Sequence, residues 1–205
     1  IYAHIFCRPD QVEDEVNGVL DLTFYLLDAF GFNKYDVMLA TKPAKAVGSD
    51  EQWELATESL RNTLDHRNIP FNIDDGGGAF YGPKIDVHIQ DAIGRRWQIT
   101  TVQFDFNLPE RFGLNYIAED GEQYQPYMVH RAILGSLERF IGVLIEHYSG
   151  SFPVWLSPVQ AVIIPIADRH INFAEEISKE FSRSDIRVET DARNERMNAR
   201  IRDAQ

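Results

Sequence analysis

The sequence predicts an α+β fold, in which an antiparallel sheet carries helices on one face. Apolar side chains alternate with polar ones over residues 84–90, and a turn at 92–95 joins this segment to a second extended segment at 97–106. This arrangement is typical of an antiparallel hairpin. Helical spacing of apolar residues precedes the hairpin and follows it. Elements grouped in this way favour α+β over a doubly wound parallel sheet.

The first third of the chain alternates between helical and extended patterns. Apolar residues recur at helical spacing over 10–30, with Asp10 in the position of the N-cap and Gly31 in that of the terminating glycine. The patterns that follow predict a strand at 35–41, a loop at 42–49, a helix from Asp50 that ends before Pro70 and buries Trp53, Leu60 and Leu64, and a short strand at 71–73.

The second half predicts a loop, a long helix and a further domain. Residues 107–129 are rich in Pro, Gly and Tyr and indicate a loop, while 130–148 has apolar residues at helical spacing and predicts a helix buried against the sheet. Turn residues at 149–153 lead us to divide the chain into domains 1–152 and 153–205. The second domain has βαβα order, with strands at 159–165 and 186–190 and helices at 170–181 and 193–205, which predicts a parallel sheet. We expect this domain to be truncated, since about 50 residues are too few to complete it.

Composition excludes several classes of protein. Apolar residues make up 44% and charged residues 25% of the 205 residues, which excludes a disordered chain. No apolar run approaches the roughly 20 residues of a membrane-spanning helix. A single cysteine, Cys7, and the lack of a signal-peptide pattern predict a cytoplasmic protein without membrane partners. The net charge of −12 repels polyanions, so nucleic acid would have to bind a local basic patch.

Residues 130–140 place two cations and a Gly-Ser pair at one end of the predicted helix. Gly135 lets a ligand approach closely, and the Arg139 guanidinium can donate two hydrogen bonds to a phosphate. The alternative is a packed helix in which Arg139 pairs with Glu138 at the surface. Spacing alone does not decide between the two.

His4 and His130 are candidate zinc ligands, although they are far apart in the sequence. Two neutral imidazoles can serve zinc, but a metal site needs at least a third protein ligand. Cys7 is a poor candidate because, three residues beyond His4 in a strand, it points to the opposite face. Two structural histidines are the alternative.

Polar residues of the predicted hairpin are the remaining candidates. Lys84 shares a strand face with Asp86 and His88, and a solvated face is the simpler interpretation. Gln98 and Gln103 are five positions apart, so both line one pocket only if a bulge or bend interrupts the strand.

A local excess of positive charge lies near the end of the chain. Residues 193–202 contain one glutamate and four arginines, Arg193, Arg196, Arg200 and Arg202. A solvated helix is the simpler interpretation, and a site for tRNA or another anion is the alternative.

Several motifs, in order along the chain, resemble the bacterial-type threonyl-tRNA synthetase family. They are Ala-His-Ile-Phe-Cys at 3–7, Asp-Glu-Val-Asn-Gly at 14–18, Gly-Ala-Phe-Tyr-Gly-Pro-Lys-Ile at 78–85, Thr-Val-Gln-Phe-Asp-Phe at 101–106, the run from His130 to Arg139, and Arg-Asn-Glu-Arg at 193–196. The resemblance covers essentially the whole chain. It implies the later half of a class II catalytic domain, ending in the motif Gly-Ser-Leu-Glu-Arg, followed by the start of an anticodon-binding domain.

The resemblance also implies roles for individual residues. His4 and His130 match zinc ligands, and the third ligand, a cysteine, would precede residue 1. Tyr81, Lys84 and Gln103 match the threonine side of the pocket, and Gln98, Ser136 and Arg139 match the ATP side; Lys84 and Arg139 are the expected catalytic residues. Asn194, Glu195 and Arg202 match the anticodon-reading region. Zn²⁺ and ATP with Mg²⁺ are the implied cofactors.

The function implied by the resemblance is that of a threonine–tRNA ligase, in a full-length protein that is a homodimer. A non-catalytic RNA-binding paralogue or fragment of the family is the alternative. The family usually has Gln-Asp-Asp before Ala-His, whereas Ile1 and Tyr2 stand in the last two places here. The arginine of the second class II motif would also precede residue 1, so we expect the fragment alone to be poorly active.

Overall fold

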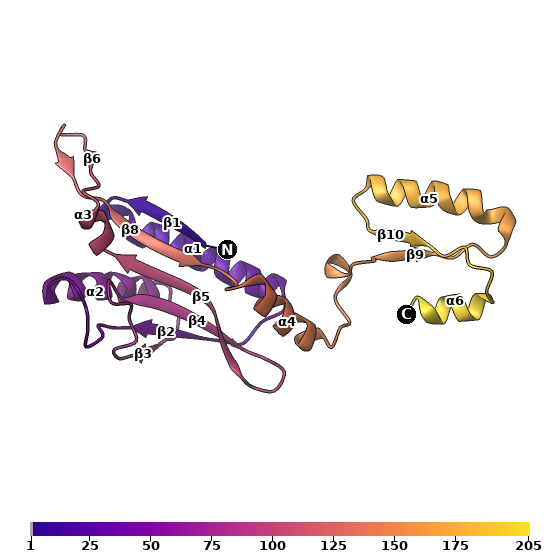
Figure 1. Ribbon diagram of the computed structural model, residues 1–205, viewed down its shortest axis with the longest axis horizontal. Helices are drawn as coiled ribbons and strands as arrows, with labels where there is room; N and C mark the ends of the chain where they lie inside the picture. Colours follow the sequence, from indigo (N-terminus) through magenta and orange to yellow (C-terminus); the bar gives the residue numbers. More distant parts are fainter. Residues whose placement is uncertain (1) are drawn as a thin grey trace. The chain divides into compact units, whose positions relative to one another are not determined.

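The computed structural model describes residues 2–205 and consists of two compact units, the first ending at His147 and the second spanning Tyr148–Gln205 (Figure 1). Ile1, one of the two residues that replace the acidic pair of the family motif, lies outside the described residues. We describe each unit by itself.

A mainly antiparallel sheet dominates the first unit (Figure 1). Within residues 2–205 it has six strands, ordered β1-β8-β5-β4-β2-β3. The strands are β1 (Tyr2–Cys7), β2 (Tyr35–Ala40), β3 (Asn72–Asp74), β4 (Lys84–Gln90), β5 (Arg96–Asp105) and β8 (Tyr127–Ala132). All neighbours are antiparallel except β2 and β3, which are parallel. The predicted hairpin is therefore confirmed as β4–β5.

One face of the sheet forms the core because apolar residues alternate along each strand. Ile85, Val87 and Ile89 of β4 and Val102 of β5 are fully buried. Two helices, α1 (Val12–Ala29) and α2 (Asp50–His66), cover this face: α1 contacts β1, β5 and β8, and α2 contacts β4. The opposite face carries the polar members of the same alternation. The predicted α+β class is confirmed.

The two long helices follow their predicted bounds with one difference in capping. Ser49 caps α2, accepting a hydrogen bond from the backbone N–H of Gln52. The predicted N-cap of α1 is wrong: a 3₁₀ turn (Pro9–Gln11) precedes the helix, and Asp10 pairs with Arg8 instead. Gly31 ends the helix at a φ of 77°, as its position predicted.

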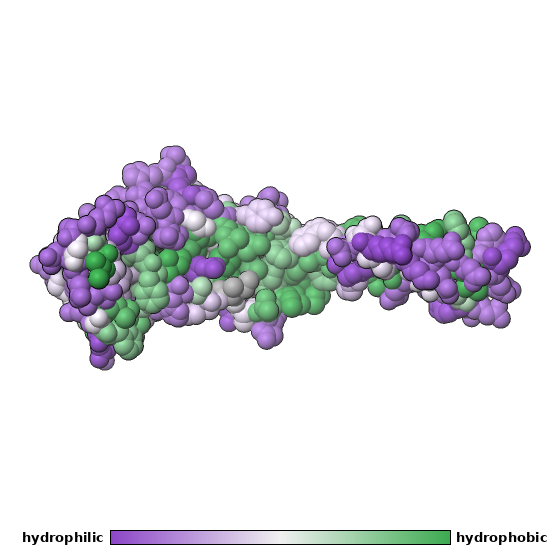
Figure 2. All heavy atoms as spheres, turned by 90° about the horizontal axis from the view of Figure 1, so that it is seen from above, coloured by the Kyte–Doolittle hydropathy of each residue, from purple (hydrophilic) through white to green (hydrophobic). Residues whose placement is uncertain are grey.

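The predicted helix at 130–148 is wrong in its first part and in its burial. His130 and its neighbours belong to β8, and the helix α4 (Leu137–Tyr148) begins only after a bend in which Leu134 and Gly135 have positive φ. Phe140 packs against Phe30, at the end of α1, with ring centroids 4.9 Å apart. The other side of α4 is exposed at Leu137, Ile141 and Ile145, and Figure 2 shows apolar residues on the visible surface of this unit.

The predicted loop at 107–129 contains short regular elements. These are α3 (Asn107–Arg111) and a small antiparallel hairpin of β6 (Tyr116–Ile117) and β7 (Gln123–Tyr124). β8 begins within the same range, at Tyr127.

The second unit has the predicted βαβα order. Its strands β9 (Ala161–Ile163) and β10 (Val188–Thr190) are parallel, which confirms that prediction. The helices are α5 (Ile171–Arg183) and α6 (Met197–Asp203), and 3₁₀ turns lie at Val154–Leu156 and Asp168–His170. β9 is half-buried rather than buried on both faces, which corrects the interpretation of its apolar run. No helix among the described residues combines the length and apolar character needed to cross a membrane.

Candidate active site

Four of the predicted site residues form a row across the polar face of the sheet. His4 on β1 is the register partner of His130 on β8, His130 is that of Gln103 on β5, and Gln103 is that of Lys84 on β4. Directly opposed residues of neighbouring strands point to the same side of a sheet. The fold therefore brings together side chains that are up to 126 positions apart in the sequence, as the numbers of His4 and His130 show.

Gln98 joins this face through an irregularity in the ladder. The register between β4 and β5 shifts between Val87 and His88, so that Gln98 lies opposite His88, on the strand face that also carries Lys84. Without the shift, Gln98 and Gln103 would point to opposite faces, because their spacing is odd. The structure thus contains the bulge on which a shared pocket depends.

Tyr81 reaches the row from the turn that precedes β4. Its hydroxyl donates a hydrogen bond to Oε1 of Gln103, and its ring centroid is 5.4 Å from that of His130. Burial raises the pKa of the Tyr81 phenol, with further contributions from Tyr2 and Asp105. The phenol is therefore kept as a neutral hydrogen-bond donor.

Asp86 links two of the predicted residues, and sequence reasoning missed this role. The solvated face assigned to Lys84, Asp86 and His88 is wrong, because Asp86 is 3% exposed. One carboxylate oxygen pairs with Lys84 Nζ, and the other accepts from Gln98 Nε2 at 2.6 Å. The sequence contained a signal for this contact, because Asp86 is two residues from Lys84 in an alternating strand and therefore lies on the same face.

His88 is the next residue on this strand face. Its Nδ1 is buried and lacks a hydrogen-bond partner among the described residues. Burial lowers the pKa of His88, and the positive charge of Arg96 lowers it further. Both effects favour the neutral imidazole.

His130 lies in a buried cluster at the other end of the row. Its Nε2 is 2.7 Å from Oδ2 of Asp105, and its Nδ1 is 2.7 Å from the hydroxyl of Tyr2. The His4 and His130 ring centroids are 4.8 Å apart. Asp105 is fully buried, and its second oxygen accepts hydrogen bonds from the backbone N–H groups that open α3. Sequence reasoning also missed Asp105.

The side chains of this face supply part of a zinc site. The Asp105 carboxylate favours the proton on Nε2 of His130, which leaves Nδ1 for a metal, the arrangement seen when a carboxylate orients a histidine ligand. No group of three or more His, Cys, Asp or Glu side chains suited to a metal occurs among residues 2–205. Cys7 is buried on the other face of β1, and burial, with Glu15 and Asp10, raises its pKa to about 11. This chain thus supplies two neighbouring imidazoles.

Arg139 lies beside Gln98, and Ser136 lies beside Arg139. Arg139 Nη1 is 3.5 Å from the backbone oxygen of Gln98, and its guanidinium is 5.5 Å from the Trp97 ring centroid. The Arg139 backbone N–H donates to Ser136 Oγ at 3.3 Å. Gly135 adopts a φ of 57°, and a Cβ there would make only ordinary contact, at 3.6 Å from the Gln98 oxygen. Conformation rather than space therefore requires this glycine.

The residues predicted to read an anticodon lie in the second unit. Asn194 and Glu195 are exposed in the segment between β10 and α6, and the Arg202 side chain is 75% exposed. The local positive charge is smaller than the sequence suggested. Arg193 pairs with Asp191 and Asp203, and Arg200 is buried with its Nη1 bonded to the Asp191 backbone oxygen, so a solvated face is wrong for Arg200.

Two family models match the chain. Residues 1–148 match the family model described as tRNA synthetase class II core domain (G, H, P, S and T). The chain belongs to this class II synthetase family. Residues 160–205 match a second model, described as an anticodon binding domain.

Similar proteins are threonine–tRNA ligases. Those of Sulfurihydrogenibium sp. and Aquifex aeolicus are 61% and 53% identical over 203 residues, 99% of this chain and 32% of each relative. A crystal structure described as the RNA binding domain of threonyl-tRNA synthetase from Cryptosporidium parvum has a TM-score of 0.92 at 39% identity, over 99% of this chain and 51% of that one. The resemblance to threonyl-tRNA synthetases is thus confirmed. This chain spans about a third of the curated relatives' length.

A more distant likeness shows how far the fold extends. Histidyl-tRNA synthetase of Staphylococcus aureus has a TM-score of 0.59 at 14% identity, over 99% of this chain and 55% of that one. At this identity the likeness concerns the fold alone.

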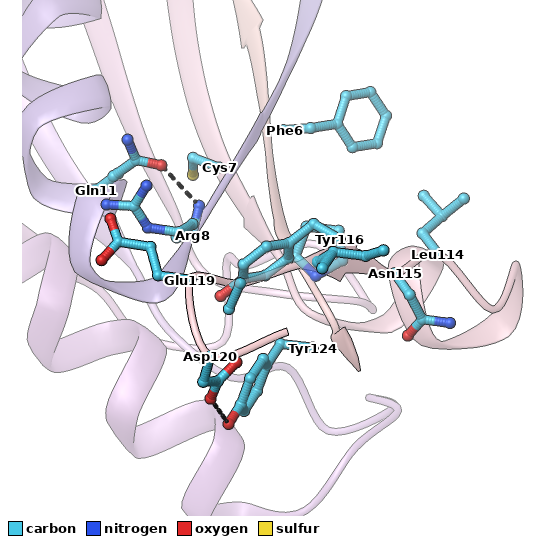
Figure 3. Close-up of a pocket in the computed structure, with 13 residues that line it drawn as sticks. Phe6, Cys7, Arg8, Gln11, Leu114, Asn115, Tyr116, Glu119, Asp120 and Tyr124 are labelled. Carbon is cyan, nitrogen blue, oxygen red and sulfur yellow. Dashed lines mark hydrogen bonds between the residues drawn. The ribbon is translucent and has the colours of Figure 1, made fainter. Parts of the chain in front are cut away.

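A cavity of about 960 Å³ lies elsewhere in the class II core, between the end of β1 and the β6–β7 hairpin (Figure 3). Phe6, Tyr116 and Ile117 are among its lining residues, with Glu119 and Asp120. Asp120 accepts a hydrogen bond from the Tyr124 hydroxyl (Figure 3). None of the predicted threonine, ATP or zinc residues lines this cavity. We therefore place the candidate active site on the polar face of the sheet.

Proposed function

We propose that the full-length protein containing this chain is a threonine–tRNA ligase. It activates threonine with ATP to threonyl-adenylate and then transfers the threonyl group to tRNA(Thr). The observation that carries the proposal is the row of His4, His130, Gln103 and Lys84 on one face of a class II sheet. The similarity to threonine–tRNA ligases supports the choice of amino acid.

The first step needs positioning and positive charge more than covalent help. The threonine carboxylate attacks the α-phosphorus of ATP in line, the bond to the β-phosphate bridging oxygen breaks, and pyrophosphate leaves. The Lys84 ammonium stabilises the negative charge that develops at the reacting centre. In the second step a hydroxyl of the terminal ribose of tRNA takes the acyl group, and AMP leaves.

In this proposal threonine and ATP contact different groups of residues. Tyr81 and Gln103, which are hydrogen-bonded to each other, bind threonine. Gln98 and Ser136 contact the nucleotide, and Arg139 holds its outer phosphates with a planar guanidinium. ATP enters as its magnesium complex.

His4 and His130 would hold zinc together with a ligand from outside this chain. Bound zinc supplies coordination positions for both the amine and the hydroxyl of threonine, a pair that valine lacks. Asp105 fixes the His130 ring, and Tyr2 must release Nδ1 before that nitrogen can serve as a ligand.

The second unit extends the proposal to tRNA. Asn194, Glu195 and Arg202 are proposed to contact the anticodon, since they are exposed in a region that matches an anticodon-binding family. We also propose that the full-length protein is a homodimer, as the family resemblance implies. Its proposed location is the cytoplasm, which the single cysteine favours.

The test is threonine-dependent ATP–pyrophosphate exchange in the full-length protein. Arg139→Ala should lower the exchange rate by about tenfold or more, because a charge-assisted contact to phosphate is lost. Unchanged exchange would remove this role of Arg139. Salt-dependent tRNA binding without exchange in the wild type would instead support the non-catalytic RNA-binding alternative.

A further inference from the structure

We propose that Asp86 is a positioning residue that holds the threonine side and the nucleotide side of the active site at a fixed separation. The inference rests on the proposed ligase function. Neither a family motif nor the sequence pattern assigned a role to Asp86, and its two contacts in the structure carry the argument.

Each oxygen of the Asp86 carboxylate has its own partner. Oδ2 pairs with Lys84 Nζ, and Oδ1 accepts a hydrogen bond from Gln98 Nε2 at 2.6 Å. Lys84 belongs to the proposed threonine side and reacting centre, and Gln98 to the nucleotide side. A single planar carboxylate therefore sets the distance between one functional group from each side.

The surroundings make this bridge rigid. The Asp86 side chain is 4% exposed and that of Lys84 is 15% exposed, so little water competes for the pair. A buried charge is costly unless it is paired and hydrogen-bonded, and here both oxygens are satisfied. A buried ion pair often adds little stability compared with apolar residues of similar size. The main effect of Asp86 is therefore to place Lys84 and Gln98.

Placement matters most for Lys84. A lysine side chain has four rotatable bonds and loses considerable rotamer entropy when it is fixed. Asp86 holds the ammonium before substrate arrives, which lowers the cost of bringing positive charge to the reacting centre. Gln98, which reaches this face only through the β-bulge, is held by the other oxygen.

The test cuts the two contacts separately in the full-length protein, by ATP–pyrophosphate exchange. Asp86→Asn keeps an oxygen that can accept from Gln98 but presents an NH₂ group to Lys84. We expect kcat/KM for threonine to fall about tenfold or more, while the KM for ATP changes by less than about twofold. Gln98→Leu cuts the other contact and should raise the KM for ATP.

Two further measurements separate positioning from support of the fold. In a Lys84→Met background, Asp86→Asn should cause no additional loss, because Asp86 acts through Lys84. Asp91→Asn is the matched control: Asp91 is another buried carboxylate of the β4–β5 hairpin, with its side chain fully buried and bonded to Arg95 and Trp97. Asp91→Asn should lower thermal stability and should have no selective effect on the kinetic constants for threonine or for ATP.

Several outcomes would overturn the inference. One is a threonine kcat/KM for Asp86→Asn that equals that of the wild type. Another is an equal effect on both substrates, as expected of a merely structural residue. Should Asp86→Asn fail to fold, Asp86→Glu, which keeps the charge, is measured instead: a loss confined to threonine supports the inference, and unchanged kinetics overturn it. A wild type without threonine-dependent exchange would defeat the proposed ligase function itself, and this inference with it.

Discussion

His130 lies between two oxygen partners that would have opposite effects on the proposed zinc site. Asp105 at Nε2 orients the ring, whereas the Tyr2 hydroxyl at Nδ1 occupies the nitrogen that the proposed zinc ion would need. We expect Asp105→Asn to weaken zinc binding about 10- to 100-fold, the usual cost of losing such a carboxylate partner. Tyr2→Phe should strengthen it about fivefold, because a hydrogen bond worth about 1 kcal/mol no longer has to be broken.

Chelator competition with the full-length apo-protein measures both effects. Asp10→Asn is the control, since Asp10 is an exposed carboxylate that pairs with Arg8 and should leave the zinc Kd unchanged. If Asp105→Asn binds zinc as tightly as the wild type, His130 is not the ligand that we propose.

Single residues also show what a sequence can and cannot reveal about the site. The family resemblance predicts Lys84 and Gln103 as site residues, and their pairing in the sheet places them on one face. Asp86 and Asp105 were missed because polar residues alternating with apolar ones normally face solvent. Their burial depends on partners such as Gln98 and His130, which come from other strands.

At the scale of elements, the β4–β5 turn is held by one buried carboxylate. Burial opposes the charge of Asp91, but hydrogen bonds from Trp97, Arg95 and the Ile93 backbone more than compensate and lower its pKa from 3.8 to about 2. The folded pKa lies below the unfolded one, so this stabilisation is complete above about pH 4 and is lost as the pH falls towards 2. The thermal midpoint should therefore fall with pH in this range.

The Asp91→Asn variant tests this prediction, because asparagine has no carboxyl group to ionise. Its thermal midpoint should be lower than that of the wild type at pH 6 and should change less between pH 4 and pH 2. Parallel pH profiles for the two proteins would show that Asp91 is not the group responsible.

Gly82 fixes the turn that places Tyr81 and Lys84. A Cβ at Gly82 would lie 1.7 Å from the backbone oxygen of Phe104 on β5, which cannot move without disturbing the sheet. Gly82→Ala should destabilise the fold by about 3 kcal/mol or more. Gly18→Ala is the control: Gly18 lies inside α1 with no atom within 4 Å of the added Cβ, so a gain of about 0.5–1 kcal/mol is expected.

Urea denaturation measures the free energy of unfolding of both glycine variants. The activity of the full-length protein is a second measurement. Activity of the full-length Gly82→Ala protein should fall even where it remains folded, because Tyr81 and Lys84 move with the turn. A Gly82→Ala variant as stable as the wild type would contradict the close approach to β5.

Elements were predictable where they were long and regular. The helices α1 and α2 and the β4–β5 hairpin have sustained periodicity. The error at 130–148 arose because β8 and α4 are close together in the sequence, and the boundary is set by positive φ at Leu134 and Gly135 rather than by a change in composition. The β6 and β7 strands have two residues each, too few to show a period.

At the scale of the whole chain, charge limits how it can contribute to the proposed binding of tRNA. The net charge of −12 gives this chain no general attraction for a polyanion, so its own contribution to affinity has to come from a few exposed cations. In the second unit, Arg193 is already paired with two aspartates. The sequence correctly located the arginines but could not show which were neutralised, because Asp191 and Asp203 flank the counted segment.

Arg200 and Arg202, two residues apart, should therefore behave differently. Arg200 is 7% exposed and bonds to the Asp191 backbone, while the Arg202 side chain is 75% exposed and pairs with Asp203. Arg200→Ala should destabilise the second unit by about 1–3 kcal/mol through lost packing and hydrogen bonding. Hydrogen exchange at β9 and β10 reports this locally. Arg202→Ala should leave hydrogen exchange unchanged and weaken tRNA binding by the full-length protein. It should also lower the slope of log K against log salt concentration by about one. Equal effects of the two variants on hydrogen exchange would contradict this division of roles.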